Sequence, residues 1–176
     1  LSYYSIELDE ELLLWSLKTT LPFLKLERIL TLSGSNQLLT YQGEWQDLSS
    51  ETNTIIAIQI YVGDGRVTLP MAASLNKISS LNAIFQDAFS PRKNPALWSV
   101  EWFLFLKSIS APNVQLSTYS SAVSIRKSLL AANWTVESAA GFAFKKSMTK
   151  AKLSGVTNEQ LLLQMTRSPS LEIHDK

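Results

Sequence analysis

Cysteine is absent from the 176 residues, and histidine occurs once, as His174. Without thiols the chain forms neither disulfides nor thiolate zinc sites, and a single histidine in a polar tail makes metal binding or a Ser–His nucleophile improbable. No apolar run reaches the roughly 18 to 20 residues of a membrane span, and residues 1–11 lack the basic-then-apolar layout of a signal peptide. We therefore expect a cytoplasmic protein without a metal or a membrane partner.

Charge is nearly balanced over the whole chain, at +1, but it is unevenly distributed. Residues 1–111 contain 8 Lys/Arg and 11 Asp/Glu, whereas residues 112–176 contain 8 and 4. The C-terminal part is therefore the better candidate for contact with a polyanion. The alternative is that Lys145, Lys146, Lys150 and Lys152 form an ordinary solvated strand edge.

Hydrophobic periodicity alternates between strand and helix along most of the chain, which predicts an α/β fold. The expected strands are residues 3–6, 81–86, 114–119, 134–137 and 142–148, with a long hairpin formed by 37–41 and 54–61. The expected helices are residues 10–18, 66–75, 97–108 and 121–132, with a short one at 159–165. This order is typical of a mostly parallel sheet with helices on both faces, and the last two strands predict one antiparallel edge strand. We assign residues 1–153 to one domain and 154–176 to a C-terminal tail.

Residues 87–98 (DAFSPRKNPALW) are the most informative stretch, because they follow an apolar run, 81–85, that we expect to be a buried strand. Open α/β sheets place ligand sites at the carboxyl ends of their strands. Two prolines stiffen the loop and hold its polar groups at fixed positions. The alternative is a plain connection in which Asp87 caps the following helix. The aromatic residues of 97–108 are expected in the core.

Three acidic residues follow three of the expected strands: Glu7, Asp64 and Asp87. Because the carboxyl ends of parallel strands converge on one crevice, we expect a single ligand to meet all three. Glu7 suits a ribose diol, and Asp64, between Gly63 and Gly65, suits an adenine amino group. Asp87 would then face the reacting centre. Each acid could instead be a turn or cap carboxylate.

Several segments together resemble the MnmC-like methyltransferase family: residues 87–98, 116–122 (LSTYSSA), 125–127 (IRK) and 141–148 (GFAFKKSM). The likeness covers most of residues 2–152. It implies a Rossmann-like, class I S-adenosylmethionine-dependent methyltransferase fold in which residues 3–6 form the second strand of the family pattern. The first strand and its glycine-rich loop are missing, so we expect the sequence to be part of a longer product.

The resemblance implies methylation of the 5-aminomethyl nitrogen of a wobble (2-thio)uridine in tRNA, with S-adenosylmethionine as cofactor. It implies a catalytic role for Asp87 and cofactor binding by Glu7, Gly63 and Asp64. The substrate-binding positions that it implies are Lys93, Asn94, Lys145 and Lys146. A separate FAD-dependent oxidase is a candidate partner.

Two alternatives stay open at this point. Phe144 and Ser147 stand where the family has Arg and Glu, which leaves another amine acceptor open. The second alternative is a non-catalytic Rossmann-like module, degenerate in its cofactor site, that binds a partner.

Overall fold

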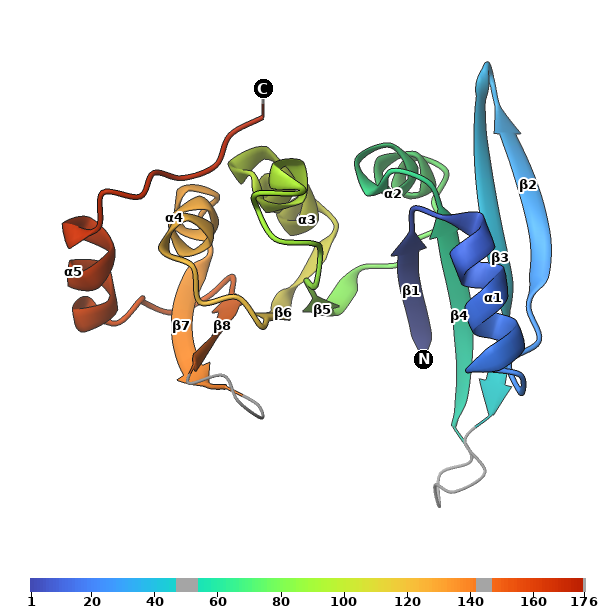
Figure 1. Ribbon diagram of the computed structural model, residues 1–176, viewed down its shortest axis with the longest axis horizontal. Helices are drawn as coiled ribbons and strands as arrows, with labels where there is room; N and C mark the ends of the chain where they lie inside the picture. Colours follow the sequence, from blue (N-terminus) through green and yellow to red (C-terminus); the bar gives the residue numbers. More distant parts are fainter. Residues whose placement is uncertain (47–53, 142–146, 176) are drawn as a thin grey trace. The chain divides into compact units, whose positions relative to one another are not determined.

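The computed structural model describes residues 1–46, 54–141 and 147–175. The chain divides into two compact units, Leu1–Ser79 and Ser80–Lys176, and each unit contains one four-stranded sheet (Figure 1). The predicted domain boundary at residue 153 stays a prediction. Within the described residues, no helix is both long enough and apolar enough to cross a membrane.

The first unit combines one sheet with two helices. Its elements are β1 (Ser2–Glu7), α1 (Glu10–Thr19), β2 (Glu27–Ser33), β3 (Asn36–Gln46), β4 (Ile55–Val62) and α2 (Gly65–Ser74). The strand order is β1-β4-β3-β2, in which β1 and β4 are parallel and the other pairs are antiparallel. The predicted hairpin of 37–41 with 54–61 is confirmed as β3 and β4.

The two helices of this unit cover opposite faces of its sheet. Helix α1 begins where the Asp9 carboxylate accepts hydrogen bonds from the backbone N–H groups of the first turn, and its Leu13 packs in the core with Tyr41 and Ile60. Successive strand residues point to opposite faces, so Tyr61 lies on the other side from Ile60. The Tyr61 hydroxyl donates to the Lys77 carbonyl just after α2, 3.2 Å away.

In the second unit, the two helices that connect successive strands lie over one face of the sheet, and the last helix lies to the side (Figure 1). Its elements are β5 (Leu81–Phe85), a 3₁₀ turn (Pro95–Trp98), α3 (Val100–Ser108), β6 (Ser110–Thr118), α4 (Val123–Ala131), β7 (Thr135–Ala140), β8 (Ser147–Lys152) and α5 (Glu159–Arg167). The strand order is β5-β6-β8-β7. Leu116, Ala151 and Val136 are register partners across β6, β8 and β7, and all three are buried. This row forms the centre of the core of the unit.

The prediction of a mostly parallel sheet is not confirmed. Among the described strands, β1–β4 and β5–β6 pair in parallel, and each sheet also contains two antiparallel pairs. One reason is β2, a strand that the sequence analysis missed, which the turn at 33–36 joins to β3. The helix at 159–165 is confirmed as α5.

The antiparallel strand of the second sheet lies in its interior, which corrects the predicted edge position. Strand β8 pairs with both β6 and β7, so β7 occupies the edge. The crossover through α4 places β7 two positions from β6, and the chain then returns as the antiparallel strand β8 between them. The strand also begins at Ser147, so most of the predicted range 142–148 lies outside the described residues.

Strand β5 is not buried as predicted. Ile84 is buried, but its neighbours Ala83 and Phe85 are exposed, and 83% of Phe85 is accessible. The reason is its place in the sheet: β5 is an edge strand, with β6 as its one neighbour among the described strands.

The C-terminal segment 168–175 crosses α3 and α4 and is held by backbone and side-chain contacts. The Val100 N–H donates to the Ile173 carbonyl, and the Ile173 N–H donates to the Ser128 hydroxyl. At the end of the segment, His174 Nδ1 lies 2.9 Å from a carboxylate oxygen of Glu101. This contact lowers the pKa of Glu101 to about 2 and raises the pKa of His174 above its usual value.

The loop after β5 is held by the side-chain amide of its own Gln86 and by two tryptophan indoles. The Gln86 side chain is buried, and its Nε2 donates to the Leu97 carbonyl at 2.7 Å. Its Oε1 accepts from Trp102 Nε1 at 3.4 Å, and Trp98 Nε1 donates to the Phe89 carbonyl at 2.7 Å. Both ends of the segment 86–98 are therefore tied to buried groups.

We expect the stability of the segment 168–175 to depend on pH through the contact of His174 with Glu101. A raised histidine pKa means that the stabilisation is present below the unfolded pKa and is lost as the pH rises through the folded value. Because the chain contains one histidine, His174→Ala should flatten the change in unfolding free energy between about pH 5.5 and 8. Denaturant unfolding measured across this range tests this, and an equal pH dependence in the variant would contradict it.

Replacing Gln86 with leucine should destabilise the second unit. The substitution leaves the Trp102 indole N–H and the Leu97 carbonyl without their partner, which costs about 1–3 kcal/mol for a buried polar group. Gln115→Leu, at an exposed position of β6, is the matched control and should change stability by less than about 0.5 kcal/mol. Equal unfolding free energies for the two variants would show that the Gln86 contacts do not hold the loop.

Candidate functional site

Two of the predicted cofactor residues lie at the carboxyl ends of adjacent parallel strands in the first unit. Glu7 ends β1 and is the register partner of Val62, which ends β4. The Gly63 N–H donates to the Glu7 carbonyl at 2.8 Å, so the pairing continues one residue past β4. Asp64 follows directly. The structure therefore brings Glu7, Gly63 and Asp64 together at one edge.

The turn at Gly63 requires glycine. Its φ of +125° lies in a region that residues with a side chain rarely adopt, and a Cβ there would lie 3.0 Å from Thr68 Cγ2. Asp64 then caps α2, its Oδ1 accepting from the Arg66 N–H at 2.9 Å. The cap role that the sequence offered as an alternative for Asp64 is therefore present.

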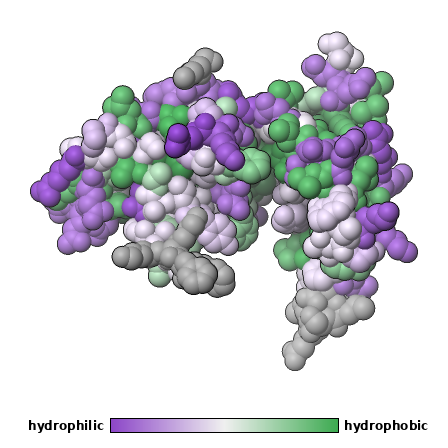
Figure 2. Space-filling view, in the orientation of Figure 1, coloured by the Kyte–Doolittle hydropathy of each residue, from purple (hydrophilic) through white to green (hydrophobic). Residues whose placement is uncertain are grey.

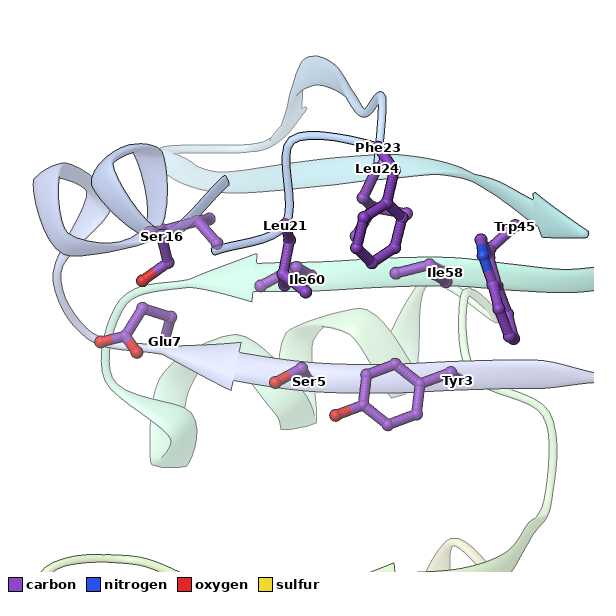
Figure 3. Close-up of a pocket in the computed structure, with 11 residues that line it drawn as sticks. Tyr3, Ser5, Glu7, Ser16, Leu21, Phe23, Leu24, Trp45, Ile58 and Ile60 are labelled. Carbon is purple, nitrogen blue, oxygen red and sulfur yellow. The ribbon is translucent and has the colours of Figure 1, made fainter. Parts of the chain in front are cut away.

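An apolar groove of about 450 Å³ adjoins Glu7 in the first unit (Figure 3). Figure 3 shows Glu7 and Ser16 at one end and Trp45 toward the other, with β1 along one side. The lining residues are Tyr3, Ser5, Glu7, Leu13, Ser16, Leu21, Phe23, Leu24, Trp45, Ile58 and Ile60. Hydrophobic side chains also reach the visible surface of this unit among polar ones (Figure 2). The groove is large enough for a small organic ligand.

The second unit presents Asp87 at the carboxyl end of a parallel strand pair. Strand β5 runs parallel to β6, and the Gln86 N–H donates to the Ser117 carbonyl at 2.9 Å, one residue past the end of β5. Asp87 comes next and is exposed. The alternative in which Asp87 caps the following helix is wrong, because the Ser99 hydroxyl caps α3 by accepting from the Trp102 N–H.

The loop after Asp87 forms a hydrogen-bonded turn between its two prolines. The N–H groups of Lys93 and Asn94 both donate to the Ser90 carbonyl, at 2.8 and 2.9 Å. The Lys93 ammonium lies 5.9 Å from the centre of the Phe89 ring, close enough for a cation–π contact. Lys93 and Asn94 therefore have fixed backbone positions a few residues from Asp87.

The predicted site residues fall into three groups. Glu7, Gly63 and Asp64 are adjacent in the first unit, and Asp87, Lys93 and Asn94 share a strand end and its loop in the second. Lys145 and Lys146 lie outside the described residues. The convergence of the three acids on one ligand stays a prediction.

Sequence reasoning missed two polar residues of the second unit. Gln86 was assigned to the end of an apolar strand. An amide side chain beside Asp87 already indicated that the loop is held by side-chain hydrogen bonds. Arg126 lies in a motif that carries the family resemblance, but the sequence analysis gave it no role. The structure shows it 6% exposed and hydrogen-bonded to Thr149 and Ser138. A single arginine on the apolar side of a helix was the available signal.

Comparisons with known proteins identify the family of this chain. A family model described as S-adenosyl-L-methionine-dependent methyltransferase matches residues 34–154, more than half of the chain. Curated relatives named "tRNA 5-methylaminomethyl-2-thiouridine biosynthesis bifunctional protein MnmC" include that of Ectopseudomonas mendocina, 33% identical over 53% of this chain and 13% of the relative. The same-named protein of Pseudoalteromonas translucida is 30% identical over 70% of this chain and 17% of the relative.

A solved structure, "MNMC2 from Aquifex Aeolicus", is also similar, with a TM-score of 0.56 and 28% identity over 69% of this chain and 39% of that one. The chain thus spans less than a fifth of these two curated relatives. The matched family range includes β4 with its glycine turn and the whole Asp87 loop. The chain therefore belongs to the S-adenosyl-L-methionine-dependent methyltransferases, as an MnmC-like methyltransferase domain.

Proposed function

We propose that this chain methylates the 5-aminomethyl nitrogen of a wobble (2-thio)uridine in tRNA, as part of a tRNA-modifying enzyme. The observation that carries the proposal is the position of Asp87: an exposed carboxylate at the end of a parallel strand, on a loop tied down by Gln86 and Trp98. The names of the curated relatives support the choice of acceptor. A cytoplasmic location and a separate FAD-dependent oxidase partner belong to the same proposal.

The residues at the end of β1 and β4 fit the cofactor of this family. One oxygen of Glu7 accepts from the Asp9 N–H at 3.1 Å, and within the described residues the other makes no hydrogen bond, so it can accept from a ribose hydroxyl. Asp64 likewise uses only Oδ1 as a cap. Gly63 lets the backbone turn without a side chain between the two acids. The groove beside Glu7 adds apolar surface for a nucleoside.

Asp87 suits the role of a proton acceptor for an amine. S-adenosylmethionine supplies an electrophilic methyl group when bound. Methyl transfer to a neutral amine forms the N–C bond, breaks the S–C bond and leaves a proton on nitrogen that must depart. The Asp87 carboxylate accepts a hydrogen bond from the amine N–H, which orients the lone pair, and then takes this proton.

The cationic and amide groups near Asp87 suit a nucleotide. Lys93 and Asn94 have fixed backbone positions on the same loop, where an ammonium and an amide can pair with phosphate or base oxygens. We assign Lys145 and Lys146 to tRNA phosphates, where each cation adds salt-dependent affinity.

Replacing Asp87 with asparagine should retain cofactor binding and lower turnover by roughly 10²-fold or more, because the amide cannot take the proton. Single-turnover methylation of hypomodified tRNA by the full chain, with nucleoside analysis of the product, measures this. Glu159→Gln, an exposed acid in the first turn of α5, is the control and should leave the rate unchanged. An unchanged rate in Asp87→Asn would remove Asp87 from the mechanism.

Replacing Glu7 with glutamine should weaken S-adenosylmethionine binding by about tenfold, since the charge-assisted hydrogen bonds to the ribose are worth about 1.5–3 kcal/mol. Titration calorimetry measures this, with Glu11→Gln on the exposed side of α1 as the matched control. No heat from S-adenosylmethionine in the unmodified full chain would instead favour the non-catalytic binding module.

A further inference from the structure

Arg126 is a buried cation without a carboxylate partner in the second unit. Only 6% of the residue is exposed, and none of the ion pairs among the described residues includes it. Burial lowers the pKa of its guanidinium. A buried charge is costly unless an opposite charge or several hydrogen bonds compensate it. Its compensation within the described residues comes from hydrogen bonds to neutral groups alone, and no carboxylate balances the charge.

The guanidinium lies over a row of hydroxyl groups that crosses the sheet. Thr118, Thr149 and Ser138 are register partners on β6, β8 and β7, so their side chains share one face. Arg126 Nε donates to Thr149 Oγ1 at 3.0 Å, and Nη2 is 3.3 Å from Ser138 Oγ. The Thr149 hydroxyl in turn donates to the Ser120 carbonyl at 2.7 Å, which extends the hydrogen-bond network to the segment after β6.

One end of the guanidinium is left for a further acceptor. The third hydrogen bond of Arg126 runs from Nη2 to the Met148 carbonyl at 3.4 Å. All three hydrogen bonds therefore use Nε or Nη2. Nη1 forms no hydrogen bond within the described residues, and it is not among the polar atoms that are sealed from solvent without a partner. Ser138, which Nη2 contacts, is exposed. The N–H groups of Nη1 are therefore available to a further acceptor, and the exposed Ser138 lies at the other nitrogen of the same guanidinium.

This place is at the same edge of the sheet as Asp87. Strands β5, β6 and β7 run in one direction, because β5 is parallel to β6 and β8 is antiparallel to both β6 and β7. Their carboxyl ends lead to Asp87, to Ser120 and to the end of the strand that carries Ser138. Helix α4 starts at this edge too, and its N-cap, Ala122, provides no side-chain hydrogen bond. Its positive end adds to the attraction for an anion.

We propose that the Arg126 guanidinium binds a phosphodiester group of the RNA acceptor at this edge, an inference that rests on the proposed function. The phosphate oxygen accepts from the Nη1 group, and the Ser138 hydroxyl, which accepts from Nη2, keeps its own proton for donation to an anion. The oxyanion supplies the missing counter-charge, and it holds the nucleotide on the side of the sheet where Asp87 stands.

The test compares tRNA binding by the full chain and by Arg126→Gln at several salt concentrations. The glutamine keeps an amide donor for Thr149 but removes the charge. We expect about tenfold weaker binding at low salt, and a slope of log affinity against log salt that is smaller by about one. The matched control is Lys127→Gln, which removes the neighbouring cation, whose ammonium binds the Ser168 and Ser170 carbonyls instead. It should leave both quantities unchanged.

A measurement on the unmodified chain decides the question if Arg126→Gln does not fold. The Nε–H resonance of Arg126 should shift on titration with tRNA, and inorganic phosphate at the same phosphate concentration should shift it far less. No shift, an equal shift with free phosphate, or an unchanged salt slope in a folded Arg126→Gln would overturn the inference.

Calorimetry with S-adenosylmethionine on the same preparations separates the two proposals. RNA binding that depends on Arg126 without cofactor binding would leave this inference standing and defeat the proposed methyl transfer. Methylation of tRNA together with RNA binding that is unchanged in Arg126→Gln would support the proposed methyl transfer and defeat this inference.

Discussion

The parallel pairing of β5 with β6 determines where the polar groups of the second unit lie. Because both strands run the same way, the chain leaves them at one edge, and the hydrogen bond from Gln86 to Ser117 extends the pairing up to Asp87. The crossover through α4 makes β7 run in the same direction and sets Arg126 over its end. An antiparallel β5 would release the Asp87 loop at the opposite edge, away from Arg126.

The aromatic residues packed over this sheet also act as hydrogen-bond donors. Trp98, Trp102 and Trp134 are each at most 4% exposed, and each indole N–H has an acceptor: the Phe89 carbonyl, Gln86 Oε1 and the Phe103 carbonyl. Two of these acceptors belong to the loop that carries Asp87. Phenylalanine would fill the same volume without the N–H group. Tryptophan therefore links the packing of the core to the position of the loop.

The parts of the fold that could be predicted are those with local causes. Asp9 followed by acidic residues starts α1, and prolines on both sides of Lys93 make a rigid turn, because capping and φ restriction act over a few residues. The parts that failed depend on distant partners. The burial of β5 depends on which strands flank it, and the position of β8 between β6 and β7 depends on where the α4 crossover ends. The contacts of Arg126 could not be predicted for the same reason, since its three acceptors come from β7 and β8, although its place on the apolar side of a helix was visible in the sequence.

The three candidate carboxylates differ in the number of hydrogen bonds that they make within the fold, and this difference bears on function. Glu7 and Asp64 each give one oxygen to a backbone N–H, so each has a structural role that would keep it in place without any ligand. The second oxygen of each is not used by these contacts, so capping is compatible with the proposed cofactor binding. Asp87 caps no helix, since Ser99 does so for α3, and its carboxylate makes no hydrogen bond within the described residues. The buried amide and indole groups around it hold the backbone of its loop and leave the carboxylate exposed. Folding alone gives no reason for an acid at this position, whereas the proposed proton transfer from an amine does.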